Sequence, residues 1–328
     1  MGYIVSDVMT PCEATDGQQS LLDLVRMIAS SGQAMVPVVD GDGRLEGITT
    51  GHEVVLLLGR GENLEAKRVA DIAREVLTIG PWVALDDARE LLPEHQGLAV
   101  VVDGDAVLGL LLLGEVEKFL EAIAALGPTA GQLITEVSPQ DTWGARNSRG
   151  GTLAAGVAAL QRIRDALAAT EKQRVSKLLD FPSGHGRILR VLKAAFPDAA
   201  LAAGDIDRGA VDFCVRTFGA SPIYSTEEPQ DITIEDNYDL IWCGSLLTHT
   251  RPDRWAGFLT LFRDCLTEDG VLVLTVSGPR LRDTRILRRF ALQEEQAEQV
   301  IHNYDRDGFG YSDYPGTPGY GISVASRS

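Results

Sequence analysis

The most constraining feature of the 328-residue sequence is a strand, a glycine-rich turn, a helix and a second strand in direct succession. VSKLLDF (175–181) reads as an apolar strand carrying Asp180, PSGHGR (182–187) as the turn and ILRVLKAAF (188–196) as the helix. ALAAGDID (200–207) is a second strand that ends in acidic residues. This order is typical of a nucleotide-binding β-α-β unit. The glycines let the backbone approach a ligand, the helix start offers free amides, and the acid can accept from ribose hydroxyls.

A dinucleotide site is the main alternative for this turn. Its fingerprint is GxGxxG, but here Pro182 stands where the first glycine would come and Leu189 where the third would. Asp180 directly before the turn is also unusual for a dinucleotide site. A nicotinamide or flavin cofactor is therefore the weaker interpretation.

The C-terminal part of the chain, from about residue 150 to 328, resembles the class I S-adenosylmethionine-dependent methyltransferases. LLDFPSGHGR (178–187) stands where this family has its first motif. The resemblance implies a Rossmann-like doubly wound sheet with S-adenosylmethionine as the cofactor. It also implies that Asp205 binds the ribose, that Ile206 lies against adenine and that four first-motif residues wrap the methionine portion: Asp180, Ser183, Gly184 and Gly186.

The remaining strands follow in the order of this family. SPIYST (221–226) is the expected third strand, NYDLIWCGSLLTH (237–249) the fourth with its exit loop, and VLVLTVSG (271–278) the fifth. Asp205 and Asp207 have an alternative role as caps of the helix that follows them, and Asp207 is the better placed of the two.

The carboxyl ends of these strands are where a doubly wound sheet holds its ligand. This places Gly244, Ser245 and His249 on the rim of the active site and Ser225 near the adenine. His249 is a candidate general base that accepts a proton from the methyl acceptor. The alternative is that it only packs in the connection after the fourth strand, because an activated methyl donor requires alignment more than it requires a base.

The C-terminal segment departs from the family pattern. RLRDTRILRRFALQEEQAEQVIHNY (280–304) reads as one helix, and DRDGFGYSDYPGTPGYG (305–321) shows no core pattern. The second segment is either a substrate-covering loop with Tyr311, Tyr314 and Tyr320 as contacts or an exposed segment. Only GISVAS (321–326) reads as a later strand, so we expect the domain to lack the family's final antiparallel hairpin and to be incomplete at its C-terminus.

The first 120 or so residues contain an internal repeat. SLLDLVRMIASSG (20–32) is helical, AMVPVVD (34–40) and RLEGITT (44–50) are strands around a GDG turn, and GHEVVLLLG (51–59) is a second helix. The same order returns within residues 86–126. Each unit alone is too small to bury its sheet, so the two halves are expected to fold together.

This repeat resembles a tandem CBS-domain pair, the Bateman module, over residues 1–124. VPVVDGDGRLEGITTGHEVV (36–55) carries the most specific part of the resemblance, which implies that Thr50 and Glu53 bind the phosphate and ribose of an adenosine nucleotide. In the second half Leu112 and Glu115 stand at these positions, and leucine cannot bond a phosphate. The alternative is a dimerisation platform without a ligand.

Composition limits the partners. The net charge is −17; residues 1–125 hold 21 acidic and 8 basic residues, and residues 126–328 hold 26 and 22. Neither part offers the basic surface that nucleic acid requires. No apolar run is long enough to span a membrane. The four cysteines form no CxxC clip, so no zinc or other metal site is expected, and their scatter is typical of a cytoplasmic protein.

These observations predict an α/β chain with an α+β CBS pair at 1–124, a linker at 125–150 and a methyltransferase domain at 151–328. The predicted function is S-adenosylmethionine-dependent methyl transfer to a small-molecule or sugar-type acceptor, regulated by an adenosyl ligand at the CBS pair. The alternative is a non-catalytic, adenosyl-ligand-binding regulatory protein that forms a homodimer through the CBS pair. A third interpretation is a nucleotide-sensing module that controls another protein.

Overall fold

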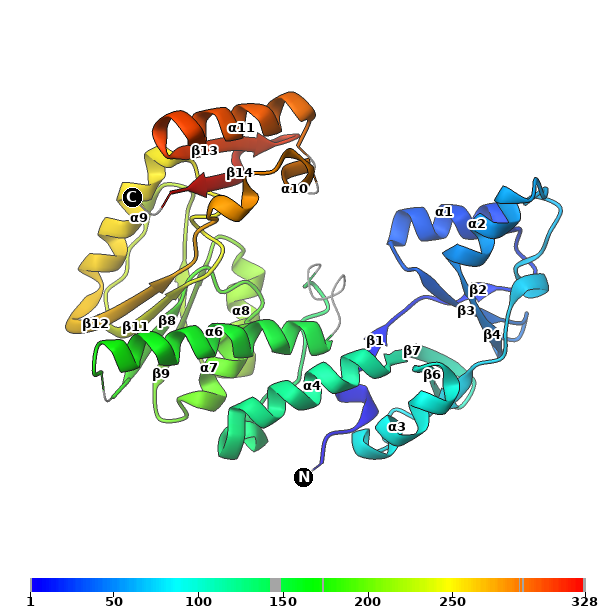
Figure 1. Ribbon diagram of the computed structural model, residues 1–328. Helices are drawn as coiled ribbons and strands as arrows, with labels where there is room; N and C mark the ends of the chain where they lie inside the picture. Colours follow the sequence, from blue (N-terminus) through cyan, green and yellow to red (C-terminus); the bar gives the residue numbers. More distant parts are fainter. Residues whose placement is uncertain (1, 142–148, 173, 289, 291, 327–328) are drawn as a thin grey trace. The chain divides into compact units, whose positions relative to one another are not determined.

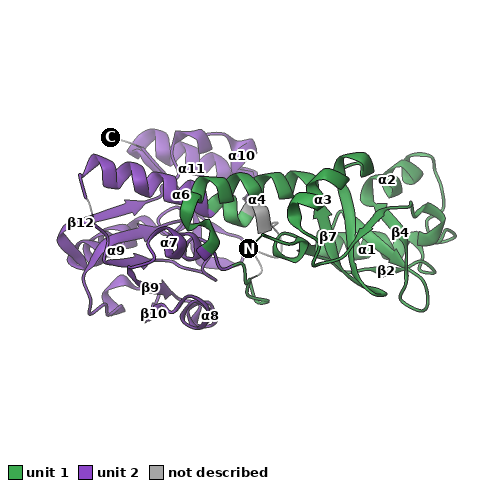
Figure 2. Cartoon of the chain, turned by 90° about the horizontal axis from the view of Figure 1, so that it is seen from below, with its two compact units in different colours: residues 1–131, 135–155 green, residues 132–134, 156–328 purple. Residues whose placement is uncertain are grey.

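The computed structural model describes residues 2–141, 149–172, 174–288, 290 and 292–326. The chain forms two compact units (Figure 1), coloured separately in Figure 2. One unit comprises residues 1–131 and 135–155, and the other comprises residues 132–134 and 156–328. The domain boundaries derived from the sequence stay a prediction.

The first unit contains the internal repeat that the sequence predicts. The first half consists of β2 (Thr15–Asp16), α1 (Leu21–Ser31), β3 (Met35–Val39), β4 (Leu45–Thr50) and α2 (Gly51–Gly59). The second half consists of β5 (Leu77–Ile79), α3 (Leu85–Leu91), β6 (Leu98–Asp103), β7 (Ala106–Leu112) and α4 (Leu113–Leu126). In both halves the first strand pairs parallel with the second, and the second pairs antiparallel with the third. The repeat is therefore confirmed.

The two halves exchange edge segments. β1 (Thr10–Pro11) precedes the first half but pairs antiparallel with β7 of the second half. Arg74 precedes the second half but exchanges two backbone hydrogen bonds of 2.9 Å with Ile48 in β4. Gly47 and Gly109 allow these approaches, because a Cβ on either would stand 2.5 Å from the backbone oxygen of the incoming segment. Short 3-10 helices accompany these elements: η1 (Val5–Asp7), η2 (Val69–Ile72), η3 (Leu92–His95) and η4 (Gly127–Gln132).

The second unit is built on a five-stranded parallel sheet with the order β10-β9-β8-β11-β12. The strand order reverses between β8 and β11, and ligands of doubly wound sheets bind at such a switch point. Figure 1 shows α6 and α7 in front of this sheet. The strands are β8 (Lys177–Asp180), β9 (Ala200–Asp205), β10 (Ser221–Tyr224), β11 (Tyr238–Cys243) and β12 (Leu266–Leu274), and the helices are α6 (Arg149–Ala169), α7 (Leu189–Ala195), α8 (Arg208–Phe218), η5 (Pro229–Asp231) and α9 (Pro252–Asp264).

Buried aromatic side chains hold the sheet against α9. Phe258 and Phe262 of this helix join a buried cluster with Leu179 of β8 and Ile241 of β11. Phe181, directly after β8, packs edge-on against Phe262 at a ring-centroid distance of 5.4 Å. This packing fixes the point at which β8 passes into the glycine turn.

The C-terminal segment differs from its predicted structure. The single helix expected at 280–304 is divided into η6 (Pro279–Leu281), α10 (Thr284–Arg288) and α11 (Glu294–Asp307). A new helix begins at Glu294 because Gln293 and Gln296 form a capping box. All neighbouring strands of the five-stranded sheet pair in parallel.

The chain nevertheless forms an antiparallel hairpin, and the expectation that it could not was wrong. β13 (Phe309–Tyr314) and β14 (Thr317–Ala325) pair as a separate two-stranded sheet. The strand at 309–314 went unrecognised because aspartate, serine and glycine alternate with its aromatic residues. Those aromatic residues are strong strand formers, and the Pro315–Gly316 pair marks the turn.

The α/β class, with a CBS-like first part and a Rossmann-like parallel sheet in the second, is confirmed. Among the helices in the described ranges, none combines the length and apolar character needed to cross a membrane.

Candidate functional site

The glycine turn after β8 is held by its own backbone. The Ser183 amide donates to the Gly204 carbonyl at 2.8 Å, and the Gly186 amide donates to the Ser183 carbonyl at 3.0 Å. Gly184 and Gly186 have φ values of +47° and +73°, which glycine adopts without strain. The turn therefore runs at the carboxyl edge of the sheet with its backbone close to β9.

Asp180 lies fully buried beneath this turn. Neither of its carboxylate oxygens has a well-aligned hydrogen-bond partner. Burial, reinforced by the nearby Asp205 carboxylate, raises the pKa of Asp180 well above its usual range, although the Leu189 amide and the Arg187 guanidinium oppose this shift. A buried carboxyl group without a well-aligned hydrogen bond is costly to keep, and the ammonium group of an amino-acid moiety would supply further donors and a positive charge. This buried carboxyl group fits the methionine part of S-adenosylmethionine.

Asp205 ends β9 and closes the turn from the other side. Its Oδ2 accepts the Gly184 amide at 2.8 Å, and its Oδ1 accepts the Asp207 amide at 2.9 Å. Burial is the main cause that raises the pKa of Asp205. Each carboxylate oxygen can accept a further hydrogen bond, which leaves capacity for ribose hydroxyls. As predicted, Asp207 rather than Asp205 caps α8, since its Oδ1 accepts from Gly209 and Ala210.

Two neighbours of Asp205 are suited to a flat apolar ring. Ile206 directly follows it and is 57% exposed, an unusual exposure for a large aliphatic side chain beside a buried acid. The Ser225 amide donates to the Asp205 carbonyl at 2.9 Å, which ties the loop after β10 to the same edge. The side of Asp205 away from the glycine turn therefore presents an apolar surface next to backbone polar groups.

The loops after β11 and β12 complete the rim. Gly244 and Ser245 follow β11 directly, and the Ser245 amide donates to Thr275 Oγ1 at 2.7 Å. Ser245 has a φ of +63° and is exposed. The structure thus brings the predicted residues of four strand ends to one edge of the sheet.

His249 lies in the turn that follows β11, next to the C-terminal hairpin. Its Nδ1 stands 2.9 Å from the Gly321 carbonyl oxygen and 3.0 Å from the Tyr314 hydroxyl. The ring also lies 5.1 Å from the ring of Tyr320, centroid to centroid. Burial lowers the pKa of His249, and the hydrogen bond to Gly321 opposes this shift in part.

The hairpin is the functional element that the sequence did not reveal. Backbone hydrogen bonds join β14 to the turn after β11, from Gly321 to His249 at 3.1 Å and from Ser323 to Thr248 at 2.9 Å. Burial raises the pKa of Tyr320, and the Asp205 carboxylate raises it further, so this tyrosine lies within electrostatic range of Asp205. The hairpin therefore covers the carboxyl edge of the sheet.

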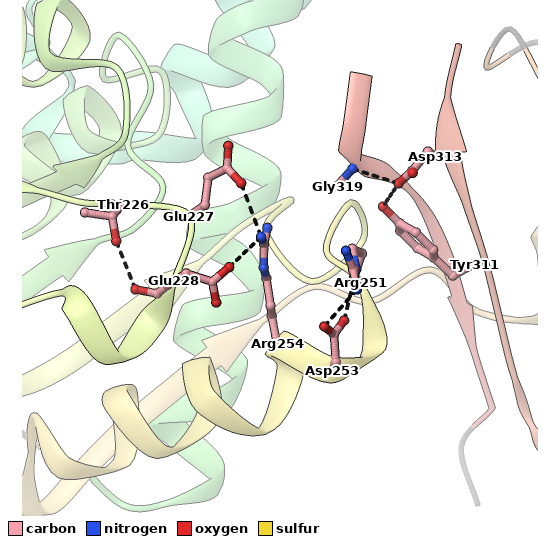
Figure 3. Close-up of polar contacts among 9 residues, drawn as sticks. All are labelled: Thr226, Glu227, Glu228, Arg251, Asp253, Arg254, Tyr311, Asp313 and Gly319. Carbon is pink, nitrogen blue, oxygen red and sulfur yellow. Dashed lines mark hydrogen bonds and ion pairs between the residues drawn. The ribbon is translucent and has the colours of Figure 1, made fainter. Parts of the chain in front are cut away.

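Arg254 of α9 pairs with two glutamates in the loop after β10 (Figure 3). Its guanidinium donates to Glu228 at 2.6 Å and to Glu227 at 3.2 Å. Gly319 of β14 lies beside this guanidinium, and its amide donates to Asp313 at 3.0 Å. The ion pairs of Arg254 thus hold the loop after β10 next to β14.

In the first unit, Thr50 and Glu53 have structural partners of their own. Thr50 is the N-cap of α2, and the two residues form a capping box. The Glu53 carboxylate accepts the Thr50 amide at 2.7 Å and pairs with Arg74 at 2.5 Å. The start of the helix accounts for both side chains, and their role in ligand binding stays a prediction.

Comparison with known proteins agrees with this division of the chain. Residues 5–59 match the family model of the CBS domain, and residues 179–272 match that of the methyltransferase domain. The chain therefore contains a CBS domain and a methyltransferase domain. The CBS match covers the first half of the repeat, and the second half repeats its elements.

Solved structures similar to this chain include CBSX2 in complex with AMP, at 26% identity, 38% coverage of this chain, 99% of that chain and a TM-score of 0.33. The CBS domain of the bacterial CNNM/CorC family Mg2+ transporter in complex with ATP is 23% identical, with coverages of 35% and 84% and a TM-score of 0.32. The CBS domains of a transcriptional regulator from Streptococcus pneumoniae are 11% identical, with coverages of 35% and 98% and a TM-score of 0.30. No curated protein matches the chain.

Proposed function

We propose that the second unit binds S-adenosylmethionine and transfers its methyl group to a small-molecule or sugar-type acceptor. The observation that carries this proposal is the buried Asp180 carboxyl group beneath the glycine turn and beside Asp205, whose oxygens have no well-aligned hydrogen bond. In this proposal Asp180 and the turn at Ser183, Gly184 and Gly186 hold the methionine part. Asp205 holds the ribose, the adenine lies against Ile206 and Ser225, and Gly244 and Ser245 line the rim.

The acceptor would approach from the side of β11 and the hairpin. S-adenosylmethionine supplies an activated methyl group, so the chain has to align the acceptor and remove its proton. His249 is the proposed general base. His249 would take up the proton that the acceptor loses as it is methylated.

Calorimetric titration of the full chain with S-adenosylmethionine tests this proposal. We expect one site per chain in the unmodified protein and at least tenfold weaker binding in Asp180→Asn and in Asp205→Asn. Asp198→Asn is the matched control, because Asp198 is exposed and away from the strand ends. Absence of binding in the unmodified protein, or equal binding in all variants, would contradict the proposal.

A second function is favoured by the surface of the first unit. Val55 and Leu58 of α2 are 62% and 52% exposed, although both are large and apolar. Exposed apolar side chains on one short helix are suited to association, and we propose that the CBS pair forms a homodimer there. The pair could then act as an adenosyl-ligand sensor, with or without turnover in the second unit.

Sedimentation of Val55→Lys and Leu58→Lys tests the association, with His52→Lys as an exposed control on the same helix. We expect the first two variants to be monomers at concentrations where the control is a dimer. Titration with AMP and ATP tests the sensor, because nucleotide binding at the CBS pair should survive the Asp205→Asn substitution. A monomeric unmodified chain that binds neither nucleotide would exclude this function.

A further inference from the structure

His249 has its two nearest polar neighbours on the C-terminal hairpin, more than 60 residues away in the chain. One is the Gly321 carbonyl oxygen at 2.9 Å from Nδ1, at a sequence separation of 72 residues. The other is the Tyr314 hydroxyl at 3.0 Å from the same nitrogen, at a separation of 65 residues. Both contacts are made to Nδ1, which limits the protonation states that the ring can adopt.

A carbonyl oxygen can only accept a hydrogen bond. Nδ1 must therefore carry a proton, since an unprotonated nitrogen at 2.9 Å would set two lone pairs against each other. With the proton on Nδ1, the Tyr314 oxygen also stands as an acceptor of that proton. In the neutral ring the remaining lone pair then belongs to Nε2.

We propose that the C-terminal hairpin is the element that positions His249, with the Gly321 carbonyl and the Tyr314 hydroxyl holding Nδ1 protonated so that Nε2 is the basic atom. The part of this inference that concerns catalysis rests on the proposed methyl transfer. His249 is the catalytic residue, and Tyr314 is a positioning residue that acts through it.

The anchoring of the hairpin supports a fixed orientation of the ring. Ser323 of β14 is buried, and its hydroxyl donates to the Thr250 carbonyl at 2.6 Å. The Ala325 amide donates to the Ser277 carbonyl at 2.8 Å, which ties the end of the hairpin to the segment after β12. His249 is thus held between two strand ends of the sheet and one strand of the hairpin.

Burial, rather than a nearby charge, favours the neutral form of the His249 ring. The ionisable groups that face it are the Tyr314 and Tyr320 hydroxyls, which carry no charge near neutral pH. Arg251 is two residues along the same turn, with its guanidinium paired to Asp253 at 3.0 Å. The Asp205 carboxylate is linked to this cluster through Tyr320. Burial lowers the pKa of His249, so the ring can accept a proton when the acceptor gives one up.

Nitrogen-15 NMR of the histidine rings in the full chain tests the tautomer without any substrate. His249 is assigned by its loss in His249→Gln, and the exposed His52 serves as the reference ring. We expect a proton on Nδ1 of His249 and none on Nε2 near neutral pH. A ring protonated on Nε2 would overturn the inference.

Tyr314→Phe removes one hydroxyl and keeps the aromatic ring. The hydroxyl oxygen bonds the charged ring more strongly than the neutral ring, so its loss should lower the pKa of His249 by about 0.5 to 1 pH unit. The acidic limb of kcat/KM should shift by the same amount, which a merely structural role would not produce. An unchanged pKa would remove Tyr314 from the proposal. Calorimetry with S-adenosylmethionine separates the two proposals, because failed cofactor binding with the expected tautomer contradicts only the proposed function.

Discussion

Gly184 and Gly186 form a matched pair in the same turn, and alanine should affect them very differently. Both residues have positive φ, so either substitution costs about 1–2 kcal/mol for the left-handed backbone. At Gly184 a Cβ would meet nothing within 4 Å, whereas at Gly186 it would stand 2.3 Å from the buried Phe218 ring. Overpacking of this kind adds about 1–3 kcal/mol. Gly186→Ala should therefore lower the free energy of unfolding by roughly 2–5 kcal/mol.

The measurement is a urea titration followed by hydrogen exchange in peptides that cover β8, α7 and α8. Peptide resolution is needed because the chain has two units and a global signal would mix their transitions. Phe218→Leu provides a double-mutant cycle, since it removes the ring edge that the new methyl group would meet. In that background Gly186→Ala should cost less than in the unmodified chain, although the 3.1 Å approach of the new Cβ to Cys214 Sγ remains.

Equal losses for the two alanine variants would refute this reasoning, because they would show that the Phe218 ring yields without cost. The expected result also limits how the cofactor site can be tested. A substitution at Gly186 would remove cofactor binding by disrupting the folded turn. Asp180→Asn and Asp205→Asn instead remove a carboxyl group with little change in side-chain volume.

Three further perturbations test the electrostatics and the helix start. Because the pKa of Asp180 is raised in the folded chain, the folded chain binds this proton more tightly than the unfolded chain does, and the contribution of the proton to stability is lost as pH rises between the two pKa values. Above that pH range, Asp180→Asn should raise the free energy of unfolding by about 1–3 kcal/mol in urea titrations. A variant that is less stable at every pH would contradict this. The side chain of Lys172 is only 6% exposed and pairs with Asp239 at 3.1 Å, so Lys172→Met should lower the free energy of unfolding by roughly 3 kcal/mol in thermal unfolding. Lys177→Met breaks an exposed pair and should cost less than about 1 kcal/mol. Equal costs would show that burial does not distinguish the two ion pairs. Thr50→Ala should lower the stability of the CBS pair by about 1 kcal/mol through loss of the helix cap. Urea unfolding of the first unit measures this change, and an unchanged midpoint would show that the capping box does not stabilise the unit.

Most elements of the fold could be predicted because their signals are local. The period-two and period-3.6 patterns of the repeat correspond to strands and helices in the structure, and the glycine turn lies between β8 and α7. Thr50 and Glu53 have the spacing of a capping box, but the resemblance to the CBS pair implies only a ligand site for them. Their role in nucleotide binding stays a prediction.

The arrangement of the hairpin could not be predicted from local pattern. β13 alternates aromatic with small or polar residues, whereas β14 has a single aromatic residue, Tyr320, followed by four consecutive buried residues at 321–324. Nothing in the sequence around His249 indicates that its ring nitrogen contacts Gly321, at a separation of 72 residues. Such contacts depend on how the chain returns over the sheet, and this requires the three-dimensional structure.

The exchange of edge segments in the first unit has a consequence for how this chain can be divided. A fragment that ends before Arg74 would keep β4 but lose the segment that covers it beside Gly47. An uncovered strand edge is a template for pairing with another chain. Separated halves would therefore be prone to pair with one another or with themselves, and the smallest part of this unit that keeps both edges covered runs from β1 through β7.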